Sequence, residues 1–173
     1  MAEVQKPAPI EPLGAPAPAG GKARLAALVG TTAAGLMLAT VALWEGKSND
    51  PYRDIVNVWT VCYGETRVEM RRYSDAECEE MLADGVGGFA HGVLESNPEL
   101  RHRPYQLAAA TSLSYNIGIN AWRGSTAARR FRAGDFAGGC RAMTWWNKAG
   151  GKVVRGLQRR REAEFKICMT GLG

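Results

Sequence analysis

Apolar residues along this chain fall into one uncharged stretch near the N-terminus and several helix-like patterns after it. Residues 25–44 carry no charged side chain, and residues 104–117 place apolar side chains three and four positions apart. The second pattern predicts a helix with a buried face, which we expect to be the central helix. Ser74 followed by Glu77 predicts a capping box that opens another helix, reaching to about residue 86. Further helices are predicted over residues 125–132, 136–146 and 156–169.

Strand signals are confined to the region just after the uncharged stretch. Residues 55–61 are rich in β-branched and aromatic side chains, which predicts a strand. We therefore expect a small antiparallel sheet near residues 52–72 and a helical C-terminal lobe. The predicted fold class is α+β, mostly helical.

The uncharged stretch has four possible interpretations. Its 20 residues would form a helix of about 30 Å, which suffices to cross a bilayer. Eleven of them are Ala, Gly or Thr, so insertion into lipid should be only marginally favourable. The stretch is a stable anchor, a cleaved signal peptide, a temporary anchor that later leaves the bilayer, or a buried helix. Lys22 and Arg24 precede it, which predicts a cytoplasmic N-terminus and an external C-terminal part.

Three segments follow from this composition. Residues 1–24 form a tail rich in Pro and Ala, which buries too little apolar surface to fold by itself. Residues 25–44 form the weakly hydrophobic anchor, and residues 45–173 form the folded domain. The net charge of +5 favours a polyanionic partner, which could be nucleic acid, an anionic membrane or an acidic cell-wall polymer.

The four cysteines are an even set without a CxxC pair, and the chain has only two histidines, so no zinc site is predicted. In an oxidising compartment they would form two disulfides, whereas in a reducing one they would be buried thiols. We favour Cys62–Cys78 and Cys140–Cys168, because each pair would join neighbouring elements.

Candidate chemistry lies directly after the uncharged stretch. Glu45, Asp54 and Thr60 follow one another with eight and then five residues between them. Two carboxylates at the end of a helix and near a strand suit inverting hydrolysis of a glycosidic bond, in which one acts as an acid and the other activates a water. Each residue alone has an ordinary structural interpretation.

This spacing resembles the catalytic signature of phage-type lysozymes, glycoside hydrolase family 24. The run 114–118 (SYNIG) and the motif at 150–162 resemble two later motifs of that family. The resemblance implies a lysozyme-like fold and cleavage of the β-1,4 bond between N-acetylmuramic acid and N-acetylglucosamine in peptidoglycan, without metal or cofactor. It assigns Glu45, Asp54 and Thr60 to catalysis and implies that Asn116 and Tyr115 contact substrate.

The absence of a linker between the uncharged stretch and Glu45 resembles signal-anchor-release endolysins. That subgroup implies export through the host translocon, an inactive state in the inner membrane with a periplasmic catalytic domain, and later release to the periplasm that depends on a holin. A bacteriolytic monomer that binds no nucleic acid is expected. In that subgroup, the freed segment is expected to join the catalytic domain.

One departure and two rival functions complete the prediction. Glu65 stands where many family members have His, which puts a structural ion pair of the family in doubt. A lytic transglycosylase would use one carboxylate only, and a membrane-tethered cell-wall-binding or nucleic-acid-binding module would use none. Trp145 and Trp146 could stack on sugars, and because they are adjacent on a predicted helix, at least one should lie in the core.

Overall fold

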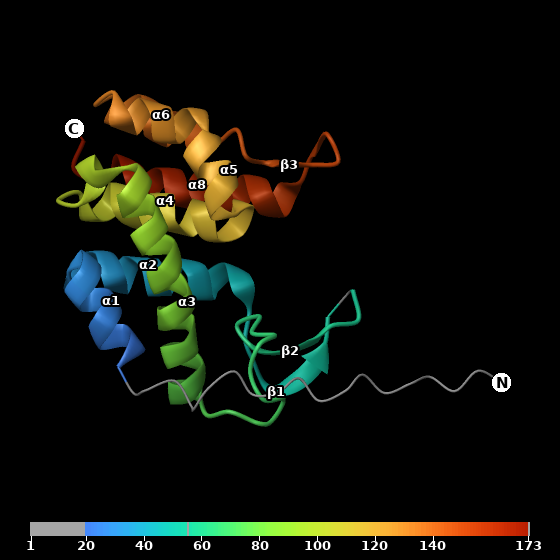
Figure 1. The fold of residues 1–173 in the computed structure, drawn as a ribbon. Helices are drawn as coiled ribbons and strands as arrows, with labels where there is room; N and C mark the ends of the chain where they lie inside the picture. Colours follow the sequence, from blue (N-terminus) through green and yellow to red (C-terminus); the bar gives the residue numbers. More distant parts are fainter. Residues whose placement is uncertain (1–19, 55, 173) are drawn as a thin grey trace.

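The fold is mostly helical with a small antiparallel sheet near the N-terminal end, as predicted (Figure 1). The computed structural model describes residues 20–54 and 56–172, so residues 1–19 of the predicted tail lie outside the described part. The helices are α1 (Gly21–Val29), α2 (Thr31–Glu45), α3 (Asp75–Ser96), η1 (Pro98–Leu100), α4 (Pro104–Ile117), α5 (Ile119–Gly124), α6 (Thr126–Arg132), α7 (Phe136–Met143) and α8 (Arg155–Met169). The strands are β1 (Ser48–Arg53), β2 (Trp59–Cys62), β3 (Lys148–Ala149) and β4 (Lys152–Val153).

The uncharged N-terminal stretch forms two helices in place of one. Gly30, with φ 83°, ends α1 and begins α2, and this backbone angle suits glycine far better than other residues. Leu25 of α1 and Met37 and Val41 of α2 are buried in the main core with the C-terminal helices. Across the described residues, none of the helices combines the length and apolar character needed to cross a membrane.

Helix α4 is the central helix, as its pattern predicted. Nine consecutive residues, 106–114, are buried, and α2, α3 and α8 all pack against it. Its start at Pro104 suits a first-turn position, where no N–H is needed. Helix α3 begins at the predicted capping box, in which Glu77 N–H donates to Ser74 and Ser74 N–H donates to Glu77. It continues ten residues beyond the predicted end.

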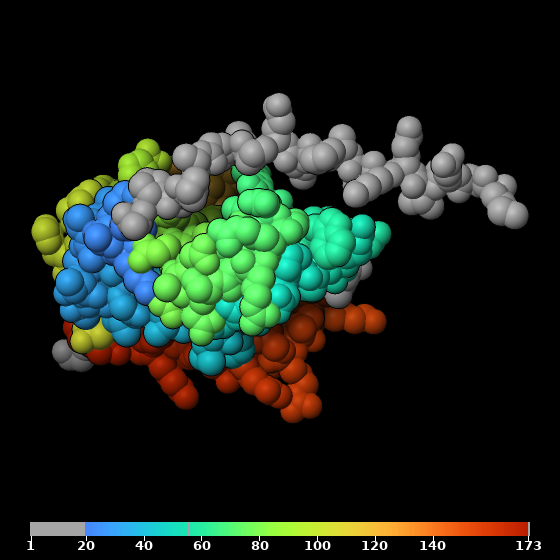
Figure 2. All heavy atoms as spheres, turned by 90° about the horizontal axis from the view of Figure 1, so that it is seen from below, coloured from blue at the N-terminus to red at the C-terminus, as the bar shows by residue number. Residues whose placement is uncertain are grey.

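The β1–β2 hairpin places its turn where a strand was predicted. Of the described part of the predicted strand, only the portion that lies in β2 (Trp59–Cys62) is a strand. Asn57 adopts a left-handed φ of 63° in the turn before it. The predicted strand was therefore wrong over residues 56–58. Seen from below, the hairpin in cyan lies beside the green segment that follows it, with the N-terminal helices in blue on the other side (Figure 2).

A second hairpin, β3–β4, was not predicted. It turns at Gly150 and Gly151, which both have positive φ. Helix α7 ends at Met143, so Trp145 and Trp146 lie in the connection to this hairpin and are 57% and 36% exposed. The expectation that one of these tryptophans is in the core was wrong, because it assumed that the helix continues through both.

Two disulfides connect neighbouring elements. Cys62 at the end of β2 is bonded to Cys78 in α3, and Cys140 in α7 is bonded to Cys168 in α8. This is the pairing that the sequence favoured. Both links join elements that already pack together, so they hold the hairpin against α3 and the last helix against α7.

Candidate active site

Glu45 is the last residue of α2, at the point where the chain turns through Gly46 into the β1–β2 hairpin. Arg160 of α8 donates from Nη1 to Glu45 Oε1 at 2.8 Å. The Glu45 side chain is 25% exposed and that of Arg160 is 6% exposed. Leu43, two residues before Glu45, is 72% exposed and so gives Glu45 little apolar shelter. Within the described residues, Oε2 of Glu45 has no hydrogen-bond donor.

A buried ionic network holds Arg160 in place. Arg160 Nε donates to Glu164 Oε1 at 3.2 Å, and Ser112 of α4 donates to the same oxygen at 2.7 Å. Arg161 also pairs with Glu164, with 2.8 Å between Nε and Oε2. Burial raises the pKa of Glu164, and Arg161 and Ser112 oppose this rise. The network therefore connects Glu45 to the centre of the α4–α8 interface.

Asp54 and Thr60 lie at the same end of the β1–β2 hairpin. Asp54 Oδ1 accepts hydrogen bonds from the N–H groups of Val56 and Val58, each at 2.9 Å, and so closes the turn. Thr60 is 3% exposed and donates its hydroxyl proton to the carbonyl of Val58 at 3.1 Å. Asp54 Oδ2 has no donor among the described residues. One oxygen on each side chain thus keeps lone pairs that a water could use.

The predicted substrate residues lie near the C-terminal end of α4. Tyr115 is half-buried, and its ring centroid is 5.0 Å from that of Phe89. Burial raises the pKa of Tyr115 to about 12, and the negative charge of Glu45 adds to this rise. Asn116 is exposed. Tyr115 therefore lies within electrostatic reach of Glu45, with Asn116 next to it on the surface.

Glu65 lies close to Tyr115, beside Gly85 of α3. A β-carbon added to Gly85 of α3 would be 3.8 Å from both Glu65 Oε1 and the Tyr115 ring, so these groups meet beside that glycine. Burial raises the pKa of Glu65; Arg67 opposes the rise and Asp84 adds to it. A second carboxyl group therefore lies next to the candidate site.

Arg160 and Glu164 are the residues that the sequence did not assign to the site. Among the described residues, Arg161 pairs with Glu164 alone, whereas Arg160 pairs with both Glu164 and Glu45. The spacing of Arg160 and Glu164, one turn apart on a helix, was the available signal. Within residues 20–54 and 56–172, no group of three His, Cys, Asp or Glu side chains is arranged to hold a metal ion.

The chain belongs to the phage lysozyme family, which matches residues 42–164, and it is a lysozyme-type glycoside hydrolase. Within that family it falls among the SAR-endolysins. It is 39% identical over 132 residues to the SAR-endolysin of Enterobacteria phage P21, covering 73% of this chain and 78% of that protein.

Solved structures agree with this assignment. The endolysin from Escherichia coli O157:H7 phage FAHEc1 superposes with a TM-score of 0.70 and 28% identity, covering 78% of this chain and 91% of that one. The active form of the P1 phage endolysin Lyz has a TM-score of 0.69, covers 88% of this chain and 95% of that one, and at 21% identity shows the shared fold.

Replacing Arg160 tests the buried network. We expect Arg160→Met to lower the free energy of unfolding by about 3 kcal/mol, because it removes the donor to Glu45 and one of the donors to buried Glu164. Urea denaturation of the purified protein measures this. Arg159→Met is the matched control, since Arg159 is the exposed neighbour on α8, and it should change stability by no more than about 0.5 kcal/mol. Equal unfolding midpoints for the two variants would contradict the network.

Glu65→Gln tests the second carboxyl group. Because burial raises the pKa of Glu65 above its ordinary value of 4.5, the folded state holds this proton more tightly than the unfolded state. Stability therefore falls as pH rises through and above 4.5. We expect Glu65→Gln to be more stable than the parent at neutral pH and equal to it well below pH 4.5. Urea denaturation at both pH values measures the difference, and a deficit at neutral pH would contradict it.

Proposed function

We propose that this chain is an endolysin that hydrolyses the β-1,4 bond between N-acetylmuramic acid and N-acetylglucosamine in peptidoglycan, and so lyses the host cell to release phage. The observation that carries the proposal is the placement of Glu45, whose Oε1 is held by buried Arg160 while Oε2 has no donor among the described residues. Glu45 lies in the region that matches the phage lysozyme family.

Glu45 is the general acid in this proposal. It donates its proton to the bridging oxygen as the bond from that oxygen to the anomeric carbon breaks. The contact from Arg160 to Oε1 fixes the orientation of the carboxyl group, so that Oε2 is the oxygen that carries the proton. A fixed orientation matters because small displacements of a catalytic group lower the rate steeply.

Asp54 and Thr60 hold the attacking water. Asp54 Oδ2 accepts one proton from the water as the water oxygen bonds to the anomeric carbon. The Thr60 oxygen accepts a hydrogen bond from the other O–H, which remains on the product as its new hydroxyl group. The backbone N–H groups on Asp54 Oδ1 keep the carboxylate in one position. Attack from the face opposite to the leaving group inverts the anomeric centre. Asn116 and Tyr115 contact the saccharide at the end of α4.

Glu45→Gln, combined with mass spectrometry of the soluble products, tests this reaction. We expect purified full-length protein to release fragments with reducing N-acetylmuramic acid ends, and Glu45→Gln to slow their release by about 10²- to 10⁴-fold. The first-formed anomer should be α, as inversion of a β-bond requires. Glu162→Gln, on the exposed face of α8, is the control and should retain activity.

Other products identify the rival reactions. Anhydro ends would establish a lytic transglycosylase and remove the role of Asp54. If folded, oxidised protein binds peptidoglycan without releasing fragments, it is a binding module.

Before release, we propose, residues 25–44 hold the protein in the host inner membrane, with the N-terminus in the cytoplasm and the catalytic domain in the periplasm. The host translocon exports it, and a holin triggers release by collapsing the membrane potential. Support comes from the SAR-endolysin relatives and from the uncharged, weakly apolar composition of the segment. Glu45 follows this segment directly, so its carboxyl group reaches Arg160 only when α2 is seated on the domain.

An uncoupler tests the release step. We expect the protein to move from the membrane fraction to the soluble fraction when the potential collapses. The double variant Gly35→Leu/Ala39→Leu tests the same step from the membrane side. Both residues are exposed on α2, so the folded state tolerates leucine there, while leucine makes insertion of the segment into lipid more favourable. This variant should stay in the membrane fraction for longer. If the parent protein also stays there after the potential is lost, this release mechanism is wrong.

A further inference from the structure

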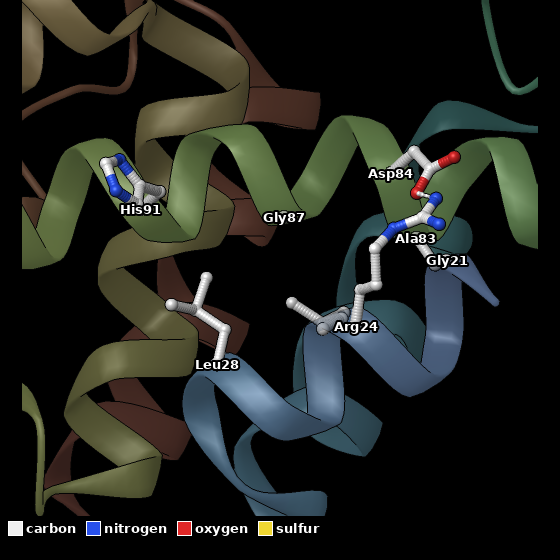
Figure 3. Close-up of a pocket in the computed structure, with 8 residues that line it drawn as sticks. Gly21, Arg24, Leu28, Ala83, Asp84, Gly87 and His91 are labelled. Atoms are coloured by element: carbon white, nitrogen blue, oxygen red, sulfur yellow. Dashed lines mark hydrogen bonds and ion pairs between the residues drawn. The ribbon is translucent and has the colours of Figure 1, made fainter. Parts of the chain in front are cut away.

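The N-terminal helix α1 is attached to α3 through charged groups at one end. Lys22 Nζ pairs with Glu79. Arg24 Nη2 lies 2.6 Å from Asp84 Oδ1, and Figure 3 shows this pair. The backbone N–H of Lys22 donates to Glu80 Oε2 at 3.0 Å. Three successive contacts therefore connect the first turn of α1 to one face of α3.

Helix α1 lacks the local features that stabilise a helix start. Gly20 precedes it without a side-chain cap, and its first turn has no acidic residue. Glu80 supplies the missing acceptor from another helix, next to the positive end of the α1 dipole. A nine-residue helix is marginal in isolation, so α1 depends on this docking.

The two helices approach closely at this end. A β-carbon added to Gly21 would lie 2.6 Å from the carbonyl oxygen of Glu80 and 2.7 Å from Asp84 Oδ1, so a larger residue would push the helices apart. A surface pocket of about 240 Å³ lies between the two helices and is lined from Gly21 and Asp84 at this end to Leu28 and His91 (Figure 3). Leu25 of α1 is 1% exposed, so the charged contacts act together with apolar packing to attach α1.

We propose that Glu79, Glu80 and Asp84 form an acidic docking face on α3 that latches α1 in the folded protein by pairing with Lys22 and Arg24. These are the two cations that border the uncharged stretch on its N-terminal side. The latch provides Lys22 and Arg24 with partners of opposite charge once they reach the folded domain. By fixing α1, it also limits the positions that α2 and Glu45 can take, because Gly30 alone separates the two helices.

The contacts themselves do not depend on the reaction that the chain catalyses, whereas a role after departure from the membrane rests on the proposed function. The paired side chains are 31–52% exposed, so added salt should weaken them. The latch is therefore reversible at high ionic strength and effective at low ionic strength.

Hydrogen exchange in purified full-length protein tests the latch. We expect Glu79→Gln/Glu80→Gln/Asp84→Asn to speed exchange of the amides of α1 by about tenfold or more, while those of α4 keep the parent rate. High salt should speed exchange of α1 in the parent protein in the same way. Glu95→Gln is the matched control, because Glu95 is on the same helix and pairs with Arg123 at 3.0 Å, away from α1. It should leave exchange of α1 unchanged.

Charge reversal separates ion pairing from a general loss of stability. Arg24→Asp and Asp84→Arg should each speed exchange of α1, and the double variant should restore most of the protection. Parent-like exchange in the triple variant, or a double variant no better than the worse single one, would overturn the proposal. If the exchange results are as expected but the protein has no muramidase activity, or is not released by an uncoupler, the latch stands. That outcome counts against the proposed function instead.

Discussion

The contact between Glu45 and Arg160 is the interaction on which the rest of the site depends, and it joins residues 115 positions apart. Without Glu45, the buried network would hold two arginines against the single carboxylate of Glu164. Seating of α2 therefore gives Arg160 a second carboxyl acceptor beside the α4–α8 interface. The same contact orients the carboxyl group that acts in the proposed reaction, so folding of the N-terminal segment and assembly of the site are one event.

Helices that carry their own local signals could be predicted from the sequence. The capping residues Ser74 and Glu77 and the buried face of α4 have the predicted roles. Features that depend on distant contacts could not be. The break at Gly30 interrupts a pattern that suits one continuous helix, and it forms because α1 packs on α3 while α2 packs on α4. The length of α3 also exceeds its prediction, because packing extends the helix beyond the initial signal.

For the site, the sequence identified residues but not their relations. Asp54 and Thr60 do lie at the same end of the β1–β2 hairpin, where both form hydrogen bonds with the backbone of Val58. The predicted strand there was partly wrong. Arg160 was not assigned because its partner lies at the other end of the chain, and no local pattern records such a pairing. The catalytic roles remain predictions from the family resemblance. Glu65 shows the limit of comparison by motif, because its environment beside Tyr115 is visible only in the folded structure.

Gly30 allows the N-terminal uncharged segment to form continuous helix of different lengths in different surroundings. In the folded protein its residues form helices of nine and 15 residues, or about 14 and 22 Å, and neither alone matches a hydrocarbon core of about 30 Å. A continuous helix through residues 25–44 would be about 30 Å long and would match it. If the segment occupies both environments, residue 30 must permit a straight helix in lipid and a sharp break on the domain. Evolution of this position is then constrained by both the bilayer and the folded domain. A residue ideal for the straight helix would impair the break, and a residue ideal for the break would impair the straight helix.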